Sequence, residues 1–164
     1  MHCGTLAPAK IVTSRAGSVS LVTGMAKPVG SAQANTALVR ESFEAFNAGD
    51  TERLLAVMAP DFVMHLAEFP QPLGRDAWRE GFEMMRRAFP DLEARVEDVI
   101  AADDKVAVRI SFHGTHSGEF QGFPASGREI HYASHEIYRV ANGLFAEEWI
   151  CSDNASLFRQ LTDA

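Results

Sequence analysis

Histidines are the side chains of this sequence best suited to proton transfer or metal binding near neutral pH. His131 and His135 are four residues apart in a predicted strand, so both point to the same face. His113 and His116 flank Gly114, which can interrupt the strand alternation. A zinc site has weak support, because there is no His-x-x-x-His on a predicted helix, no cysteine cluster and no close His-x-His pair. We therefore expect no metal, and proton transfer or ordinary hydrogen bonding for the six histidines, His2, His65, His113, His116, His131 and His135.

Acidic residues near the end of the chain form a second candidate group. On a regular strand, Glu147 shares a face with Phe145 and Trp149, whereas Glu148 takes the opposite face. Asp153 follows the strand end, where it could reach the mouth of a pocket or could equally cap the next helix. A carboxyl group buried among apolar walls has a raised pKa, which suits general acid or base catalysis.

Aromatic side chains could supply the walls of a pocket. Each alone is typical of an ordinary core, but together they suit a flat or apolar ligand. No Gly-x-Gly-x-x-Gly, Gly-Lys-Ser/Thr or Gly-x-Ser-x-Gly motif is present, so nucleotide binding and a hydrolase elbow have no support. The aromatic residues considered are Phe62, Trp78, Phe82, Phe112, Tyr132, Tyr138 and Trp149.

The spacing of apolar residues changes along the chain and indicates which elements position these groups. Apolar residues recur every three or four positions in the first half and every second position afterwards, with Asn142-Gly143 as a hairpin turn. Helices followed by antiparallel strands give an α+β class, and a curved sheet wrapped around one long amphipathic helix would leave a cavity between them. The predicted helices start at 33 and cover 52–58, 75–88 and 153–161, and the predicted strands cover 62–66, 92–101, 106–112, 128–140 and 144–151. Gly49 is expected to end the first helix, Asp50 to cap the second, and residues 69–74 to form a loop.

Length and composition fit one globular domain. The chain has 164 residues and a formal net charge of −7, which argues against a nucleic-acid partner. No apolar run is long enough for a membrane helix, and two isolated cysteines favour a reducing, cytoplasmic location. Residues 1–32 are expected to be a disordered leader, with Met25 as an alternative start, and 33–164 to be the domain.

Several ordered motifs carry a resemblance to a known family. They are Phe46-Asn47-Ala48-Gly49-Asp50, Asp61-Phe62-Val63-Met64-His65, Phe89-Pro90-Asp91, Gly114-Thr115-His116-Ser117-Gly118-Glu119-Phe120, Pro124-Ala125-Ser126-Gly127-Arg128, Glu136-Ile137-Tyr138-Arg139, Asn142-Gly143, Glu147-Glu148-Trp149 with Asp153, and Gln160-Leu161. Over about residues 33–162 the chain resembles SnoaL-like polyketide cyclases, or ester cyclases, of the nuclear transport factor 2-like superfamily. The resemblance implies a cone-shaped α+β fold with an internal pocket.

The same resemblance implies a function and a set of site residues. Studied members close a ring by an intramolecular aldol reaction with an acidic side chain and no metal or cofactor. It implies Asp153 and His135 as the acid/base and its partner. A small apolar or aromatic substrate and a homodimer are also expected. The expected substrate-binding residues are His65, His116, Glu147, Trp149, Trp78 and Phe46.

Three functions therefore compete. The first is a cofactor-independent cyclase or isomerase, in which a base removes a proton beside a carbonyl and an acid protonates the oxygen. The second is a non-catalytic ligand-binding or dimerisation module. The third is a hydrolase in which the same pocket carboxylate activates water. If Asp153 and His135 reach one enclosed pocket, the first gains support.

Overall fold

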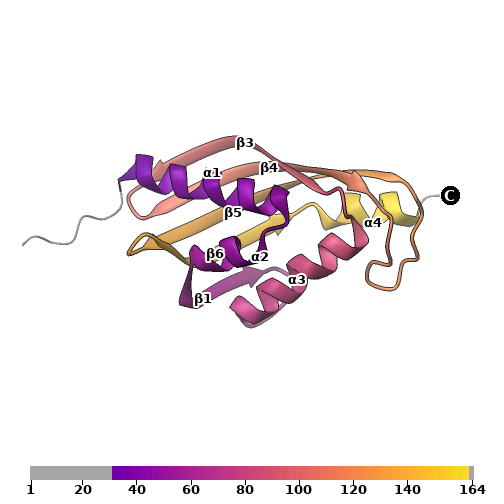
Figure 1. Ribbon diagram of the computed structural model, residues 1–164, viewed down its shortest axis with the longest axis horizontal. Helices are drawn as coiled ribbons and strands as arrows, with labels where there is room; N and C mark the ends of the chain where they lie inside the picture. The colour runs from indigo at the N-terminus through magenta and orange to yellow at the C-terminus, as the bar shows by residue number, and fades with distance from the viewer. Residues whose placement is uncertain (1–30, 163–164) are drawn as a thin grey trace, which may run out of the picture.

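A computed structural model describes residues 31–162 of the chain (Figure 1). The expected leader, 1–32, therefore lies almost wholly outside the described residues. Among the described residues, no helix is long and apolar enough to cross a membrane. The elements follow in the order α1 (Ala32–Ala48), α2 (Thr51–Ala56), β1 (Met58–Leu66), β2 (Leu73–Gly74), α3 (Arg75–Ala88), β3 (Glu93–Ala102), β4 (Lys105–Thr115), β5 (Glu129–Ala141), β6 (Leu144–Ser152) and α4 (Asn154–Thr162).

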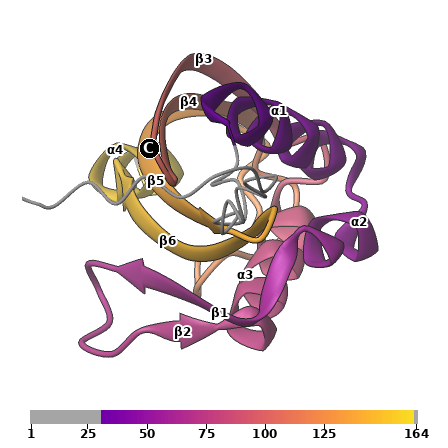
Figure 2. The same ribbon diagram turned by 90° about the vertical axis from the view of Figure 1, so that its left-hand side faces the viewer.

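One six-stranded sheet has the order β2-β1-β6-β5-β4-β3. β1 and β6 run parallel, and every other neighbouring pair is antiparallel. Seen along the strands, β3 to β6 form an arc, and α1 and α3 lie on its concave side (Figure 2). The predicted α+β architecture with a curved sheet over N-terminal helices is confirmed.

The concave face of β4 and β5 holds most of the core. On β5 every second residue from Ile130 to Val140 is buried, while the residues between them are half-buried or exposed. This period of two is the sign of a strand with one covered face. The same parity that buries Tyr132 also buries Ser134 and Glu136, so polar side chains enter the core.

The ends of the first helices follow the sequence closely. Gly49 ends α1 in the left-handed conformation, with φ of 68°, and its N–H returns to the carbonyl groups of Ala45 and Phe46. The Asp50 carboxylate then accepts a hydrogen bond from the Arg53 N–H and caps α2, as predicted. The Asn47 side chain joins α1 to the sheet, because its amide bonds both the N–H and the carbonyl of Ala94 on β3.

Two local predictions are wrong. Residues 69–74 were expected to be a loop, but Leu73–Gly74 pairs with β1 and adds the edge strand β2. The strand before Asp153 was expected to alternate without interruption, but the β5–β6 register shifts between Arg139 and Val140. Arg139 faces Glu147 and Val140 faces Phe145, so Ala146 is the extra residue of a bulge. The bulge puts Phe145 on the inner face and leaves Glu147 outside.

Candidate active site

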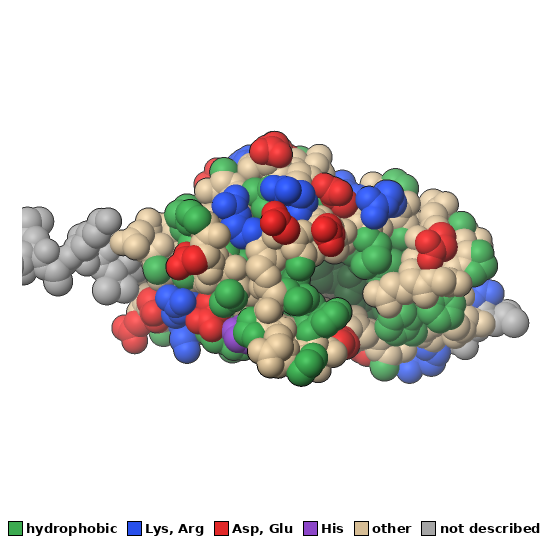
Figure 3. Space-filling model, turned by 90° about the horizontal axis from the view of Figure 1, so that it is seen from below, with side chains coloured by type: hydrophobic (Ala, Val, Ile, Leu, Met, Phe, Trp, Pro, Cys, Tyr) green, Lys and Arg blue, Asp and Glu red, His purple; other side chains and the backbone are tan. Residues whose placement is uncertain are grey.

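A cavity of about 390 Å³ lies between the concave face of the sheet and helices α1, α3 and α4. Its walls are mostly aromatic and aliphatic, and its size suits a small organic ligand. Seen from below relative to Figure 1, the surface has a hollow surrounded by hydrophobic side chains (Figure 3). Helices and the first strand contribute Phe43, Phe46, Met64, Leu66, Trp78, Phe82, Met84 and Met85, and the later segments contribute Phe112, Phe120, Tyr132, Ile150, Leu157 and Phe158.

The aromatic rings make a continuous wall on the helix side. Phe46 contacts Phe82 edge to face at 5.0 Å between ring centroids, and Trp78 stacks on Phe82 at 5.4 Å. Phe46 also contacts Phe112 on the sheet at 5.8 Å, and Phe112 stacks on Tyr132 at 4.9 Å. Such rings hold each other in place, so the walls are preorganised for a flat ligand.

The sheet side of the cavity carries a buried carboxyl group, Glu136. The Ser134 hydroxyl donates to its Oε1 at 3.0 Å, and the Tyr138 hydroxyl donates to its Oε2. Burial raises the pKa of Glu136, and the hydrogen bonds from Tyr138 and Ser134 oppose that rise. Both oxygens are therefore held in fixed positions by neutral donors.

Glu148 is a second buried carboxyl group in the same cavity. It lies directly across the strand pair from Tyr138 and is 3% exposed. Burial raises the pKa of Glu148 well above its ordinary value, and the negative charge of Glu136 raises it further. Its Oε2 has no hydrogen-bond partner among the described residues. Glu148 therefore combines a strong preference for the neutral form with a buried oxygen that no described residue binds.

A smaller space lies behind Glu148. It has a volume of about 30 Å³ and shares Phe43, Phe46, Trp78, Tyr138 and Glu148 with the main cavity. Glu148 thus stands at the inner end of the cavity. At the outer end, the Asn154 amide donates to the Glu68 carboxylate, which joins the start of α4 to the loop after β1.

The structure does not place Asp153 in this cavity. Its carboxylate accepts a hydrogen bond from the Ser156 N–H at 3.0 Å and caps α4, which is the alternative that the sequence left open. The side chain is exposed, and hydrogen bonding to Ser156 lowers the pKa of Asp153. The expectation that Asp153 reaches an enclosed pocket is wrong, because the cap turns its carboxylate to solvent.

His135 also lies outside the cavity. It occupies the exposed parity of β5, between the inward-facing Ser134 and Glu136. It therefore neither meets Asp153 in a pocket nor contacts the cavity. The expected pairing of these two residues at one enclosed site is wrong.

Three of the expected substrate-binding residues lie together on the outer face of the sheet. His65 Nε2 is 2.9 Å from Glu147 Oε1, and the His65 ring stacks on Trp149 at 5.3 Å. Arg139 Nε donates to Glu147 Oε2 at 2.9 Å. The β5–β6 bulge and the register with β1 explain this placement, since they align these side chains away from the core.

The other three expected substrate-binding residues lie in two different places. Trp78 and Phe46 line the cavity. His116 is fully buried, but it lies under the loop between β4 and β5, where its Nδ1 is 3.0 Å from the Ser126 hydroxyl. The His116 ring also packs against Phe89 at 5.3 Å. His116 fixes the loop and does not line the cavity.

The sequence analysis places Glu136 and Glu148 in family motifs but gives neither a role in the site, although the signal is present. Ile130, Tyr132, Glu136, Tyr138 and Val140 share one parity of the longest strand. A carboxylate on a strand face that is mostly apolar is a stronger indication of a site than an acid at a strand end.

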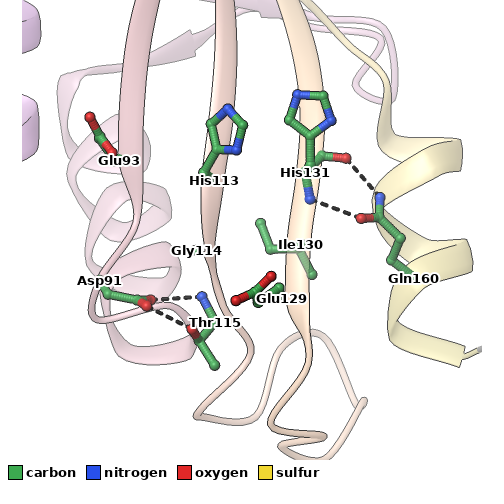
Figure 4. A pocket seen from close by; sticks show the side chains of 9 residues that line it. All are labelled: Asp91, Glu93, His113, Gly114, Thr115, Glu129, Ile130, His131 and Gln160. Atoms are coloured by element: carbon green, nitrogen blue, oxygen red, sulfur yellow. Dashed lines mark hydrogen bonds between the residues drawn. The ribbon is translucent and has the colours of Figure 1, made fainter.

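A second, open groove of about 510 Å³ lies on the outer side of β3, β4 and β5 (Figure 4). His113 and His131 face each other across the strands, with ring centroids 4.4 Å apart. Two of the three acids that line this groove with them have partners, since Asp91 accepts from Thr115 and Glu93 pairs with Arg95, and Glu129 is the third. Within residues 31–162, no group of three or more metal-binding side chains is placed to hold an ion. The enclosed cavity is therefore the better candidate for chemistry.

Comparisons with known proteins give the family of the chain. Residues 37–161 match the family model described as SnoaL-like polyketide cyclase. The chain therefore belongs to the SnoaL-like polyketide cyclase family, a family of enzymes, and its fold is the nuclear transport factor 2-like cone. The family that the sequence motifs indicated is confirmed.

Individual relatives are of moderate similarity. The aklanonic acid methyl ester cyclase DauD of Streptomyces sp. (strain C5) is 26% identical over 133 residues, which cover 76% of this chain and 79% of DauD. IdmH of Streptomyces antibioticus, a candidate polyketide cyclase, is 36% identical with a TM-score of 0.70, covering 78% of this chain and 98% of IdmH. AclR of Streptomyces galilaeus, a candidate hydroxylase, is 28% identical with a TM-score of 0.76, covering 82% and 86% of the two chains.

Proposed function

We propose that this protein is a cyclase that closes a ring within one small, flat substrate, with Glu136 as the base and Glu148 as the acid. The observation that carries the proposal is the presence of two buried carboxyl groups on one apolar cavity. Family membership supports cyclisation over a purely binding or hydrolytic role. This assignment moves the acid/base pair from Asp153 and His135 to two residues that face the cavity.

The two carboxyl groups are suited to different protonation states. Two hydroxyl groups donate to Glu136, and hydrogen bonds of this kind stabilise a carboxylate. Glu148 has an unpartnered oxygen and is buried beside that charge, so its proton is retained more strongly. Carboxyl groups whose environments separate their pKa values in this way are the usual arrangement for paired acid and base roles.

The chemistry follows from this division. Ionised Glu136 removes a proton from a carbon that lies between two carbonyl groups, and neutral Glu148 donates a hydrogen bond to the enolate oxygen that forms. The enolate carbon then attacks a ketone carbon of the same molecule. A carbon–carbon bond forms, the ketone C=O π bond opens, and the new alkoxide takes the proton removed in the first step. Substrate and product have the same composition, so the reaction is an isomerisation.

The cavity walls support a flat, largely apolar substrate with few polar groups. The rings of Phe46, Trp78 and Phe82 face the strand side, where the carboxyl groups lie. DauD is named for aklanonic acid methyl ester, and this ester is the first probe to try with the present chain. Cytoplasmic activity is part of the same proposal.

The proposal can be tested with purified protein and aklanonic acid methyl ester. Liquid chromatography with mass spectrometry should show a product of unchanged mass. We expect Glu148→Gln and Glu136→Gln each to lower turnover about 10²- to 10⁴-fold, the usual contribution of an acid or base. Asp153→Asn keeps a capping side chain and should retain full turnover.

The competing assignment gives the opposite pattern. If Asp153→Asn abolishes turnover and both glutamine variants remain active, the assignment of Glu136 and Glu148 is wrong. Circular dichroism of each variant separates lost chemistry from lost folding. Incubation in D₂O provides a second readout, since the base should exchange the acidic C–H of the ester even when ring closure is slow.

A homodimer is a further part of the proposal, and the outer face of the sheet supports it. Ile100, Ala107, Ile137, Trp149 and His65 pair in one continuous row across five strands. Ile100 and Ile137 are 71% and 43% exposed, which is unusual for isoleucine on a free sheet face. We expect light scattering to give twice the chain mass and Ile137→Lys to give the monomer. A monomeric wild-type protein at micromolar concentration would contradict this part.

A further inference from the structure

A chain of three side-chain oxygens crosses the inner face of β5 and β6. Ser134 Oγ lies 3.0 Å from Glu136 Oε1 and 2.9 Å from Ser152 Oγ. Ser134 is fully buried, whereas Ser152 is half-buried and lines the cavity. The two serines are opposite each other in the strand register, so the contact is fixed by the sheet itself.

The single proton on each serine hydroxyl fixes the direction of these hydrogen bonds. A serine hydroxyl has one proton to donate. Ionised Glu136 can only accept, so the Ser134 proton points to Glu136. The proton between the two serines must then come from Ser152. Ser152 has no proton left for the cavity and can offer a ligand only its lone pairs.

We propose that Ser134 acts as a positioning residue that holds the negative charge on Glu136 and makes Ser152 a hydrogen-bond acceptor for a substrate hydroxyl group. The proposal rests on the proposed function at one point, namely that Glu136 is the ionised member of the pair. It adds a specificity: the end of the substrate near Ser152 carries a donor such as a phenol or enol O–H. A carbonyl or methoxy oxygen at that position would meet another acceptor.

The distance between Ser152 and Glu148 indicates how long a ligand that contacts both residues must be. The two residues are four positions apart on β6, which corresponds to about 13 Å along a strand. A ligand of two fused rings, with its ketone at Glu148 and its hydroxyl near Ser152, suits this span. The ketone end takes the donor Glu148, and the hydroxyl end takes the acceptor Ser152.

A binding experiment tests the subsite without turnover. The probes are 6-acetyl-2-naphthol and 2-acetyl-6-fluoronaphthalene, which differ by a hydroxyl group and a fluorine that cannot donate. For the wild-type protein we expect the naphthol to bind about three- to tenfold more tightly, the range of one uncharged hydrogen bond. Ser152→Ala should remove this preference, and Ser152→Thr should keep it.

Ser134→Ala is the sharper variant, because Ser134 does not line the cavity. Its loss frees the Ser152 proton, so Ser152 can donate as well as accept and the preference for the naphthol should fall. The matched control is Ser111→Ala, which removes the same kind of hydrogen bond, from Ser111 Oγ to Glu97 Oε1 at 2.6 Å, on the outer face. Ser111→Ala should leave the preference unchanged.

A titration tests the charge placement independently of any probe. The protein is labelled with ¹³C at the glutamate carboxyl carbon, and the NMR signal of Glu136 is assigned with Glu136→Gln. The pH midpoint of the Glu136 titration should rise in Ser134→Ala and stay unchanged in Ser111→Ala. An unchanged midpoint in Ser134→Ala overturns the positioning role. A naphthol preference that survives Ser152→Ala, or no preference in the wild type, overturns the subsite.

These outcomes separate the inference from the proposed function. If the preference and the titration behave as expected but no cyclisation is found, the proposed reaction fails and the polarised serine pair stands. If cyclisation depends on Glu136 and Glu148 but neither serine variant changes selectivity or midpoint, the reaction stands and the inference fails.

Discussion

Glu147 and Glu148 are adjacent in the sequence but lie on opposite faces of the sheet. Outside, Glu147 binds Arg139 and His65, and these hydrogen bonds lower its pKa. Inside, Glu148 is enclosed by apolar and aromatic walls, and burial raises its pKa well above the ordinary value. The same chemical group therefore favours its ionised form on one face and its neutral form on the other. Local surroundings, and not residue type, decide which glutamate can do acid chemistry.

The difference between the two faces also predicts opposite effects of pH on stability. A carboxyl group whose pKa is raised in the folded state stabilises the protein below its unfolded pKa, and this contribution is lost as the pH rises through the folded pKa. A group whose pKa is lowered contributes above the unfolded pKa and loses that contribution as the pH falls. Glu148 belongs to the first kind and Glu147 to the second.

The largest expected effect comes from Glu148→Gln. Glutamine resembles the neutral acid and carries no charge to bury, so the variant should gain stability relative to the wild type as the pH rises above the ordinary glutamate range. The gain should be about 1.4 kcal/mol for each pH unit until the folded pKa is reached. Urea denaturation between pH 5 and pH 8 measures it. A difference that is flat with pH would show that Glu148 is ionised in the fold.

Tyr138→Phe should have the next largest effect. The variant keeps the ring but removes the hydroxyl that donates to Glu136. A hydrogen bond to a charged group contributes about 1.5–3 kcal/mol, so the pKa of Glu136 should rise by roughly one unit or more. The acid limb of the pH–rate profile should move to higher pH by that amount. An unmoved limb would mean that Glu136 is not the base.

The fold could be predicted from the sequence because the segments with a regular apolar spacing are long and uninterrupted. The switch from a helical period to a period of two indicated α+β, and Gly49-Asp50 indicated both a helix end and the next cap. The short strand Leu73–Gly74 escaped prediction because two residues cannot show a period. Its pairing with β1 depends on tertiary context.

The candidate site was predicted only in part, for a related reason. Phe46 and Trp78, which the resemblance implied, do line the cavity, and both lie on helices whose apolar faces follow from spacing. The face on which a strand residue lies depends on the register. One bulge at Ala146 puts Phe145 and Glu147 on opposite faces, although a regular strand would put them on the same face. Asp153 satisfied the rules for both a cap and a pocket acid, and only the structure distinguishes them.

Glu147→Gln should have a small effect in the opposite direction from Glu148→Gln. It weakens the contacts to Arg139 and His65 on a half-exposed surface, where such ion pairs contribute at most about 1 kcal/mol. The variant should be slightly less stable than the wild type near neutral pH, and the deficit should vanish as the pH falls below the pKa of Glu147.

Salt provides the control for this last comparison. The Glu147 contacts are accessible to counterions, so 1 M sodium chloride should remove most of the deficit of Glu147→Gln. The pH dependence of Glu148→Gln should persist in the same salt, because its carboxyl group is enclosed. If salt removed both effects equally, the two faces would not differ in solvent access and the contrast between the glutamates would fail. Cyclisation by Glu147→Gln should remain close to the wild-type rate, since the residue lies outside the cavity.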